Sequence, residues 1–107
     1  MDTVGTLVLM TAYVISDVEI LDPALAAEYR ALAGASIAAY GGRYLARPGG
    51  EIDVVEGEWR PANVVILEFP TLGDARRWYA SPEYAEALRV RGDALRRNLI
   101  FVSGDDS

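Results

Sequence analysis

The stretch NVVILEF, residues 63–69, is the strongest candidate strand in the chain and decides what kind of sheet it belongs to. Its four central residues, 64–67, are all apolar, and so are residues 99–102 (LIFV) and 7–10 (LVLM). An antiparallel strand with one face in water alternates apolar and polar residues. These three stretches do not alternate, so we expect a sheet that is covered on both faces.

The segments on either side of this strand predict the other elements. Asp22-Pro23 signals the start of a helix, Gly41-Gly42 its end, and Ser81-Pro82 the start of another helix. The expected elements are strands at 6–20, 43–47, 51–56, 63–69 and 98–103, and helices at 23–40, 72–79 and 81–97. This order indicates an α+β, ferredoxin-like β-α-β-β-α-β fold, with an antiparallel four-stranded sheet and helices on one face.

Helices of such a fold cover only one face of the sheet, and the other face needs a cover too. A second copy of the same sheet is the economical solution, since an exposed apolar face of this size would aggregate. The sequence therefore predicts a homodimer through the sheet face. We expect a single domain over 1–107, with 1–9 as an N-terminal extension and 104–107 as a disordered tail.

Composition excludes several classes of function. The net charge of −6 argues against nucleic-acid and anionic-membrane partners. The chain has no Cys and no His, and all ten of its basic residues are Arg. Thiolate, imidazole and Schiff-base chemistry are therefore excluded, and we expect neither a metal nor a cofactor. The apolar run at 7–15 is too short for a membrane span and has no basic leader, which favours a buried strand in a cytoplasmic protein.

A set of motifs resembles a known family. They are Ala12–Ile15 (AYVI), Glu28–Arg30 (EYR), Gly41–Arg47 (GGRYLAR), Glu56–Pro61 (EGEWRP), Leu67–Pro70 (LEFP) and Trp78–Tyr84 (WYASPEY). In this order they resemble the domain-of-unknown-function 1330 family of the dimeric α+β barrel superfamily. The resemblance implies the same fold and dimer. Relatives in that superfamily include cofactor-free monooxygenases, polyketide cyclases, muconolactone isomerases and haem enzymes. Members of the family often have a His where this chain has Tyr40.

Two residues are candidates for proton transfer. Glu68 is the only charge in its strand, and burial in a helix-side cavity would raise its pKa into the range of a general base. The alternative is a carboxylate tied to Arg43, Arg47 or Arg91. Tyr40 is a candidate proton donor whose pKa Arg43 would lower, or a residue that only caps a helix end.

Three arginines and an aspartate are candidates for substrate binding. Arg43 and Arg47 are four residues apart on one strand, so we expect them on the same side, gripping a carboxylate or an acidic phenol. Charges that protect an edge strand are the alternative. Arg91 falls on the core-facing stripe of its helix and needs a carboxylate, for which Glu68 or Asp17 is the candidate.

The aromatic residues complete the expected site. Trp59 lies in a polar loop and is expected to close a pocket or cover the partner subunit, and Tyr84 is a further candidate substrate contact. The first hypothesis is a cofactor-independent cyclase, isomerase or lyase acting on a small aromatic, polyketide-like or carboxylated molecule between helices and sheet. The alternatives are a non-catalytic ligand-binding or stress-response dimer and a cofactor-free monooxygenase.

Overall fold

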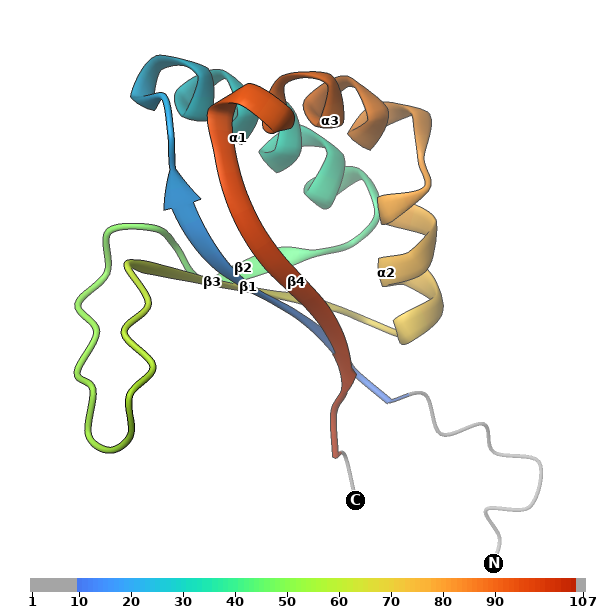
Figure 1. Cartoon of the computed structure of the whole chain (residues 1–107). Coiled ribbons are helices and arrows are strands. Elements are labelled where there is room, and N and C mark those ends of the chain that lie inside the picture. Colours follow the sequence, from blue (N-terminus) through green and yellow to red (C-terminus); the bar gives the residue numbers. More distant parts are fainter. Residues whose placement is uncertain (1–9, 106–107) are drawn as a thin grey trace, which may run out of the picture.

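The computed structural model describes residues 10–105, which form four strands and three helices (Figure 1). In chain order these are β1 (Ala12–Ile20), α1 (Pro23–Ala39), β2 (Arg43–Ala46), β3 (Asn63–Phe69), α2 (Leu72–Tyr79), α3 (Pro82–Ala94) and β4 (Leu95–Ser103). The ferredoxin-like α+β fold expected from the sequence is confirmed. Residues 6–9 of the expected first strand, the 1–9 extension and the last two residues of the expected tail lie outside the described part.

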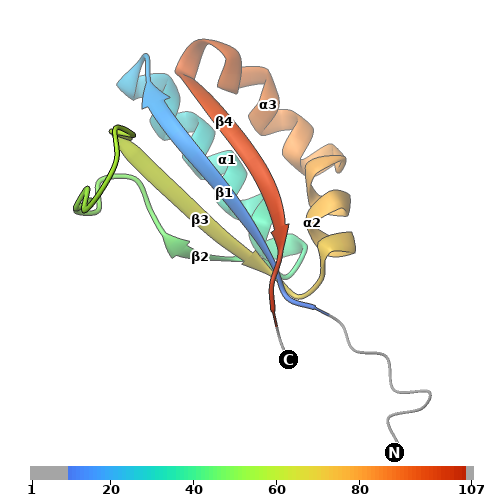
Figure 2. The same ribbon diagram turned by 60° about the horizontal axis from the view of Figure 1, so that its bottom comes forward.

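The sheet is antiparallel throughout, in the order β2-β3-β1-β4. All three helices lie over one of its faces, and no described element covers the other (Figures 1 and 2). We call the uncovered side the open face. In β1 the even-numbered residues from Ala12 to Val18 are buried toward the helices, and the odd-numbered ones between them lie on the open face, half-buried.

The core beneath the helices is built around aromatic rings. Phe69 of β3, Trp78 of α2 and Tyr84 of α3 are almost completely buried, and Trp78 lies with its ring centroid 5.3 Å from Phe69 and 4.2 Å from Tyr84. The Trp78 Nε1–H donates to Ser36 Oγ at 2.9 Å, and that hydroxyl donates to the Ala33 carbonyl at 2.7 Å. These bonds satisfy the polar atoms that core packing removes from water.

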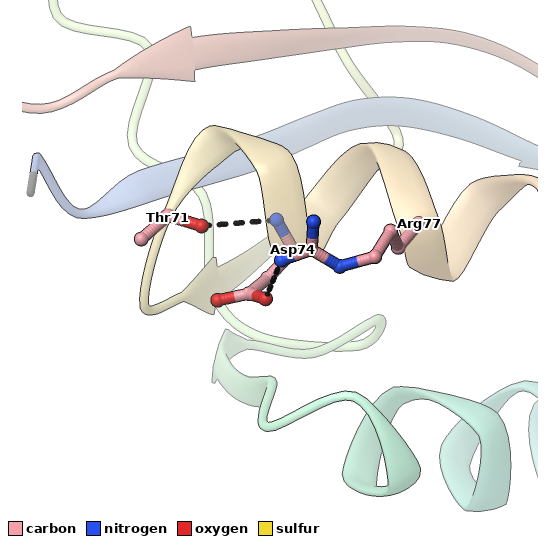
Figure 3. Close-up of polar contacts among 3 residues, drawn as sticks. All are labelled: Thr71, Asp74 and Arg77. Carbon is pink, nitrogen blue, oxygen red and sulfur yellow. Dashed lines mark hydrogen bonds and ion pairs between the residues drawn. The ribbon is translucent and has the colours of Figure 1, made fainter.

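Each helix begins at a residue whose side chain caps it. In α1 the Asp22 carboxylate accepts the N–H groups of residues 24 and 25. In α2 the Thr71 hydroxyl accepts the Asp74 N–H at 3.0 Å, and the Asp74 carboxylate accepts from Arg77 one turn later (Figure 3). That contact with Arg77 holds the pKa of Asp74 below its usual value. The short polar residues before each apolar stretch thus fix where the helices start.

The Gly41-Gly42 pair ends α1 for two separate reasons. Gly41 has a φ of +81°, in the left-handed region that disfavours side chains. A Cβ on Gly42 would lie 2.6 Å from the ring of Phe69, which is impossible without moving the core. The turn between α1 and β2 can therefore fold tightly against the end of β3.

Two sequence predictions about the elements are wrong. Residues 51–56 form no strand, because β2 pairs only with β3 and the chain over 47–62 leaves the sheet as a long projecting loop (Figure 1). The helix expected to reach residue 97 ends at Ala94. Leu95 instead pairs with Ile20, so β4 starts three residues earlier than expected and tertiary pairing overrides helix propensity.

Candidate functional site

A pocket of about 370 Å³ lies on the helix side of the sheet, between α1 and the edge strand β2. We call it the α1–β2 pocket. Six residues line it: Arg30, Ala31 and Gly34 from α1, and Tyr44, Arg47 and Pro48 from β2 and the segment after it. Two positive side chains, one phenol and a glycine thus meet where the sequence analysis expected a pocket. Of these residues, only Arg47 was among the candidates.

A bulge in β2 determines which arginine reaches this pocket. The register between β2 and β3 shifts between Tyr44 and Ala46, so the residues beyond the shift exchange faces. Arg47 consequently lies on the helix side, where its guanidinium carbon is 4.2 Å from the centroid of the Tyr44 ring. Arg43, before the shift, lies on the open face. The prediction that these two arginines share one side is wrong, because strict alternation does not continue through the bulge.

Burial shapes the chemistry of Tyr44. It raises the pKa of Tyr44 above its ordinary value; Tyr29 adds to the rise, while Arg47 and Arg30 partly offset it. At neutral pH the side chain is therefore an uncharged phenol, which can donate a proton or a hydrogen bond but cannot act as a base. None of the described residues that line the pocket has a carboxylate.

Glu68 lies on the open face, away from the α1–β2 pocket. It pairs across the sheet with Tyr13 and Arg43, and its Oε1 is 2.6 Å from the Arg43 Nε. The helix-side cavity that would make it a buried base is therefore absent at this position. Of the two readings of Glu68, the geometry favours the carboxylate tied to an arginine.

Arg91 has neither of the partners proposed for it. Glu68 and Asp17 lie on the open face, whereas α3 packs on the opposite side of the sheet. The Nε of Arg91 is buried and has no hydrogen-bond partner among residues 10–105. The predicted ion pair is wrong because strand alternation turns both carboxylates away from the helices.

Tyr40 follows the last turn of α1 and contacts α3 instead of an arginine. Its hydroxyl donates to Glu83 Oε1 at 3.0 Å, and this hydrogen bond raises the pKa of Tyr40. The direction is opposite to the lowering by Arg43 that the sequence suggested. The structure thus gives Tyr40 the helix-capping position that was its alternative reading.

Asp17 and Trp59, both candidate substrate contacts, meet on the open face. The Trp59 Nε1–H donates to Asp17 Oδ2 at 2.9 Å and ties the projecting loop to β1. With Ile15, Asn98 and Ile100 they line a hollow of about 250 Å³, which we call the open-face pocket. Three candidate residues thus line hollows on opposite sides of the sheet, Arg47 on the helix side and Asp17 and Trp59 on the open face, and the other five line neither hollow.

Tyr84 belongs to a buried polar cluster that the sequence analysis missed. Its hydroxyl lies 2.5 Å from that of Tyr29, and Arg97 donates to Tyr29 at 2.8 Å and to Tyr84 at 2.7 Å. Burial raises the pKa of Tyr84, and Tyr29 raises it further. Burial alone would lower the pKa of Arg97, but the two phenols hold it above its ordinary value. A correct β4 boundary at Leu95 would have placed Arg97 on the inward side.

Residues 10–105 contain neither a cluster of metal ligands nor a membrane-spanning helix. No group of three or more Asp or Glu side chains converges there as metal ligands would. No helix in the same range is long and apolar enough to cross a bilayer.

Known proteins share this architecture. Among solved structures, the chain resembles RPA0582, a protein of unknown function from Rhodopseudomonas palustris, with a TM-score of 0.74 and 16% identity over 97% of this chain and 89% of that one. It also resembles SnoaB, a cofactor-independent oxygenase from Streptomyces nogalater, with a TM-score of 0.61 and 12% identity over 92% and 96%. No curated protein matches the sequence.

Identities this low show a common fold and no more. The sequence itself gives a closer relationship, because the profile of one family matches residues 11–105, nearly all of the chain. The chain belongs to the family described as domain of unknown function DUF1330.

Proposed function

We propose that the protein is a cofactor-independent enzyme that performs proton-transfer chemistry on a small aromatic, polyketide-like or carboxylated molecule. Cyclisation, isomerisation and lyase reactions belong to this class. The observation that carries the proposal is the α1–β2 pocket, which offers about 370 Å³ of space beside a neutral phenol and two guanidinium groups. Small-molecule sites have this size and a similar small number of polar groups.

The pocket residues suit a reaction that develops negative charge on a substrate oxygen. Removal of a proton from carbon beside a carbonyl leaves an enolate, whose oxygen Tyr44 can hydrogen-bond and Arg47 can stabilise electrostatically. With no carboxylate on the pocket wall, the proton passes to water. The substrate must therefore have an acidic C–H or O–H group of its own. An electron-rich substrate of this kind can also react with oxygen directly, which keeps the monooxygenase alternative open.

Phenylpyruvate tests this proposal, because its enol, whose double bond is conjugated with the ring, absorbs more strongly at longer ultraviolet wavelengths than its keto form. We expect the protein to accelerate enolisation above the rate in buffer, and Tyr44→Phe and Arg47→Gln to lose most of that acceleration. Glu68→Gln is the matched control from the other side of the sheet and should keep it. No acceleration with either phenylpyruvate or the uncharged diketone acetylacetone would contradict the proposal. An oxygen electrode run in parallel detects the monooxygenase reaction.

One observation favours a second candidate, a non-catalytic ligand-binding dimer. The candidate base Glu68 is occupied by Arg43, and the α1–β2 pocket has no base of its own. Such a protein would bind small molecules in this pocket without accelerating their enolisation. The phenylpyruvate assay combined with a binding measurement separates the two candidates.

We also propose that the working unit is a homodimer that pairs two open faces. Ile66, Ile15 and Ile100 are register partners and form a continuous apolar row across β3, β1 and β4. Ion pairs lie on either side of the row along the strands, Arg43 with Glu68 on one side and Arg96 with Glu19 on the other. An apolar centre with a polar rim is the usual composition of a protein interface.

A further inference from the structure

We infer that the α1–β2 pocket is an anion site in which Arg30 and Arg47 together hold the negative group of the ligand. This inference rests on the proposed function for the position of the substrate, and adds its chemical class: a carboxylate or phenolate about one ring in size. The sequence pattern had paired Arg47 with Arg43. The bulge in β2 removes Arg43 from the site, and α1 supplies Arg30 instead.

The charge on this pocket wall is opposite to that of the whole chain. The chain carries 16 acidic and 10 basic residues, yet the part of it within residues 10–105 lines the pocket with two arginines and no acid. Of the eight other arginines, four form ion pairs within residues 10–105 (Arg43, Arg77, Arg89 and Arg96) and four do not (Arg60, Arg76, Arg91 and Arg97). Neither Arg30 nor Arg47 has a carboxylate within ion-pair distance in that part of the chain. Two cations on one pocket wall repel each other. A bound anion is attracted to both of them, and this attraction offsets the repulsion.

Tyr44 prepares Arg47 for this role. The guanidinium stacks on the Tyr44 ring with 4.2 Å between its carbon and the ring centroid. Stacking restrains the side chain while leaving its N–H groups available for a carboxylate. The neutral Tyr44 hydroxyl can donate one further hydrogen bond to the same ligand. A restrained donor loses less conformational entropy on binding than a free one.

Gly34 supplies the space for the body of the ligand. It lies within α1, where glycine lowers helix stability relative to alanine. A Cβ at this position would meet no other atom within 4 Å, so packing does not require a glycine there. The room that its missing side chain leaves is part of the α1–β2 pocket. The size of residue 34 should therefore set the size of the ligand.

A series of ligands that differ only in charge tests the anion preference. Phenylacetate, its neutral amide phenylacetamide and the cationic phenethylammonium share one ring and a similar length. In calorimetric titrations of the full chain at low salt, we expect phenylacetate to bind at least about tenfold tighter than the amide and the cation to show no binding. Added salt should weaken phenylacetate binding, since both arginines are exposed enough for screening.

Paired variants locate the site. Arg30→Gln and Arg47→Gln should each weaken phenylacetate binding roughly fivefold or more, the range for a partly exposed charged hydrogen bond. Arg76→Gln, which removes an exposed arginine of α2, is the control and should bind normally. Gly34→Leu should abolish binding by filling the pocket. Gly92→Leu, at an exposed helical glycine that also has no atom within 4 Å of its Cβ, should not.

The outcomes separate this inference from the proposed function. Equal affinity for phenylacetate and its amide, no binding of phenylacetate, or unchanged affinity in both arginine variants would overturn the anion site. Charge-selective binding without any catalysed enolisation would support the anion site and contradict the proposed enzymatic activity. Catalysed enolisation without charge selectivity would support the enzymatic activity and contradict the anion site.

Discussion

At the scale of single residues, the most unusual group in the protein is Arg97. It lies on the inward side of β4 and bonds to the hydroxyls of Tyr29 and Tyr84, with no carboxylate in ion-pair distance within residues 10–105. A buried charge without a counter-ion is costly unless hydrogen bonds satisfy it. The two phenols supply those bonds, and because they come from α1 and α3, one cluster fastens both helices to the sheet.

Removal of the Tyr84 hydroxyl should therefore destabilise the fold. Tyr84→Phe takes one acceptor from Arg97 and one partner from Tyr29, and we expect a loss of about 1–3 kcal/mol in the free energy of unfolding. Urea denaturation monitored by circular dichroism measures it. Tyr79→Phe is the control, since that ring is 40% exposed, and its effect should stay within about 0.5 kcal/mol. A Tyr84→Phe protein as stable as the parent would show that the cluster adds nothing.

The raised pKa of Tyr84 also predicts how the stability of the fold changes at alkaline pH. The folded-state pKa of Tyr84 lies above the ordinary value of 10.0, so above that pH the unfolded chain releases a proton that the folded chain retains. Stability is then fully present below pH 10 and falls as pH rises, by about 1.4 kcal/mol per pH unit from this group. Tyr84→Phe should flatten this decline. A decline just as steep in the variant would assign the effect to other groups.

The sequence predicted single residues less well than the fold. Glu68 was selected as the only charge in an apolar strand, Arg43 for its spacing from Arg47, and Asp17 as a partner for Arg91. Each has a polar partner on the open face instead. Which face each residue occupies depends on the register of β1 and β3 and on the pairing of β2, and composition cannot show either. Arg97 was missed because Leu95–Arg97 was expected to continue a helix.

At the scale of elements, local signals located the starts of the helices and failed where tertiary pairing decides. Asp22 and Ser81 cap the helices whose starts they were expected to mark, and Thr71 caps α2, which begins at the expected residue 72. The bulge in β2 and the missing strand at 51–56 have no local signal, because both depend on which neighbour the edge strand finds. The bulge matters most, since it brings Arg47 rather than Arg43 to the α1–β2 pocket.

The cap of α2 gives a test at this scale. Thr71→Ala leaves the Asp74 N–H without its acceptor at the first turn, and we expect it to cost about 1 kcal/mol of stability (Figure 3). Thr71→Ser keeps the hydroxyl and should restore most of that loss, which separates the cap from the packing of the methyl group. Thermal unfolding of the three proteins measures both. Equal losses in the two variants would contradict the capping role.

At the scale of the whole molecule, the apolar strands predicted a sheet covered on both faces, and the structure shows the layer of helices on one of them. In β1 the helix side is buried, and Ile15 on the open face is half-buried. Edge strand β4 continues that face with Ile100 and Val102, which are 55% and 39% exposed. An antiparallel sheet that needed water on this side would carry polar residues at these positions. The apolar pattern is thus the physical basis for the proposed dimer.

A charge in the middle of the open face should prevent that dimer. In a symmetric pair of sheets, Ile100→Glu would place two carboxylates in the apolar centre of the interface, where burying an unpaired charge costs several kcal/mol. We expect the parent chain to sediment as a dimer at micromolar concentration and Ile100→Glu as a monomer with unchanged circular dichroism. Leu21→Glu is the control: this leucine is 45% exposed in the turn between β1 and α1, so the variant should remain dimeric. A parent chain that sediments as a monomer would show that the open face tolerates water, and the α1–β2 pocket, which lies on the other side of the sheet, would then have to act within a single subunit.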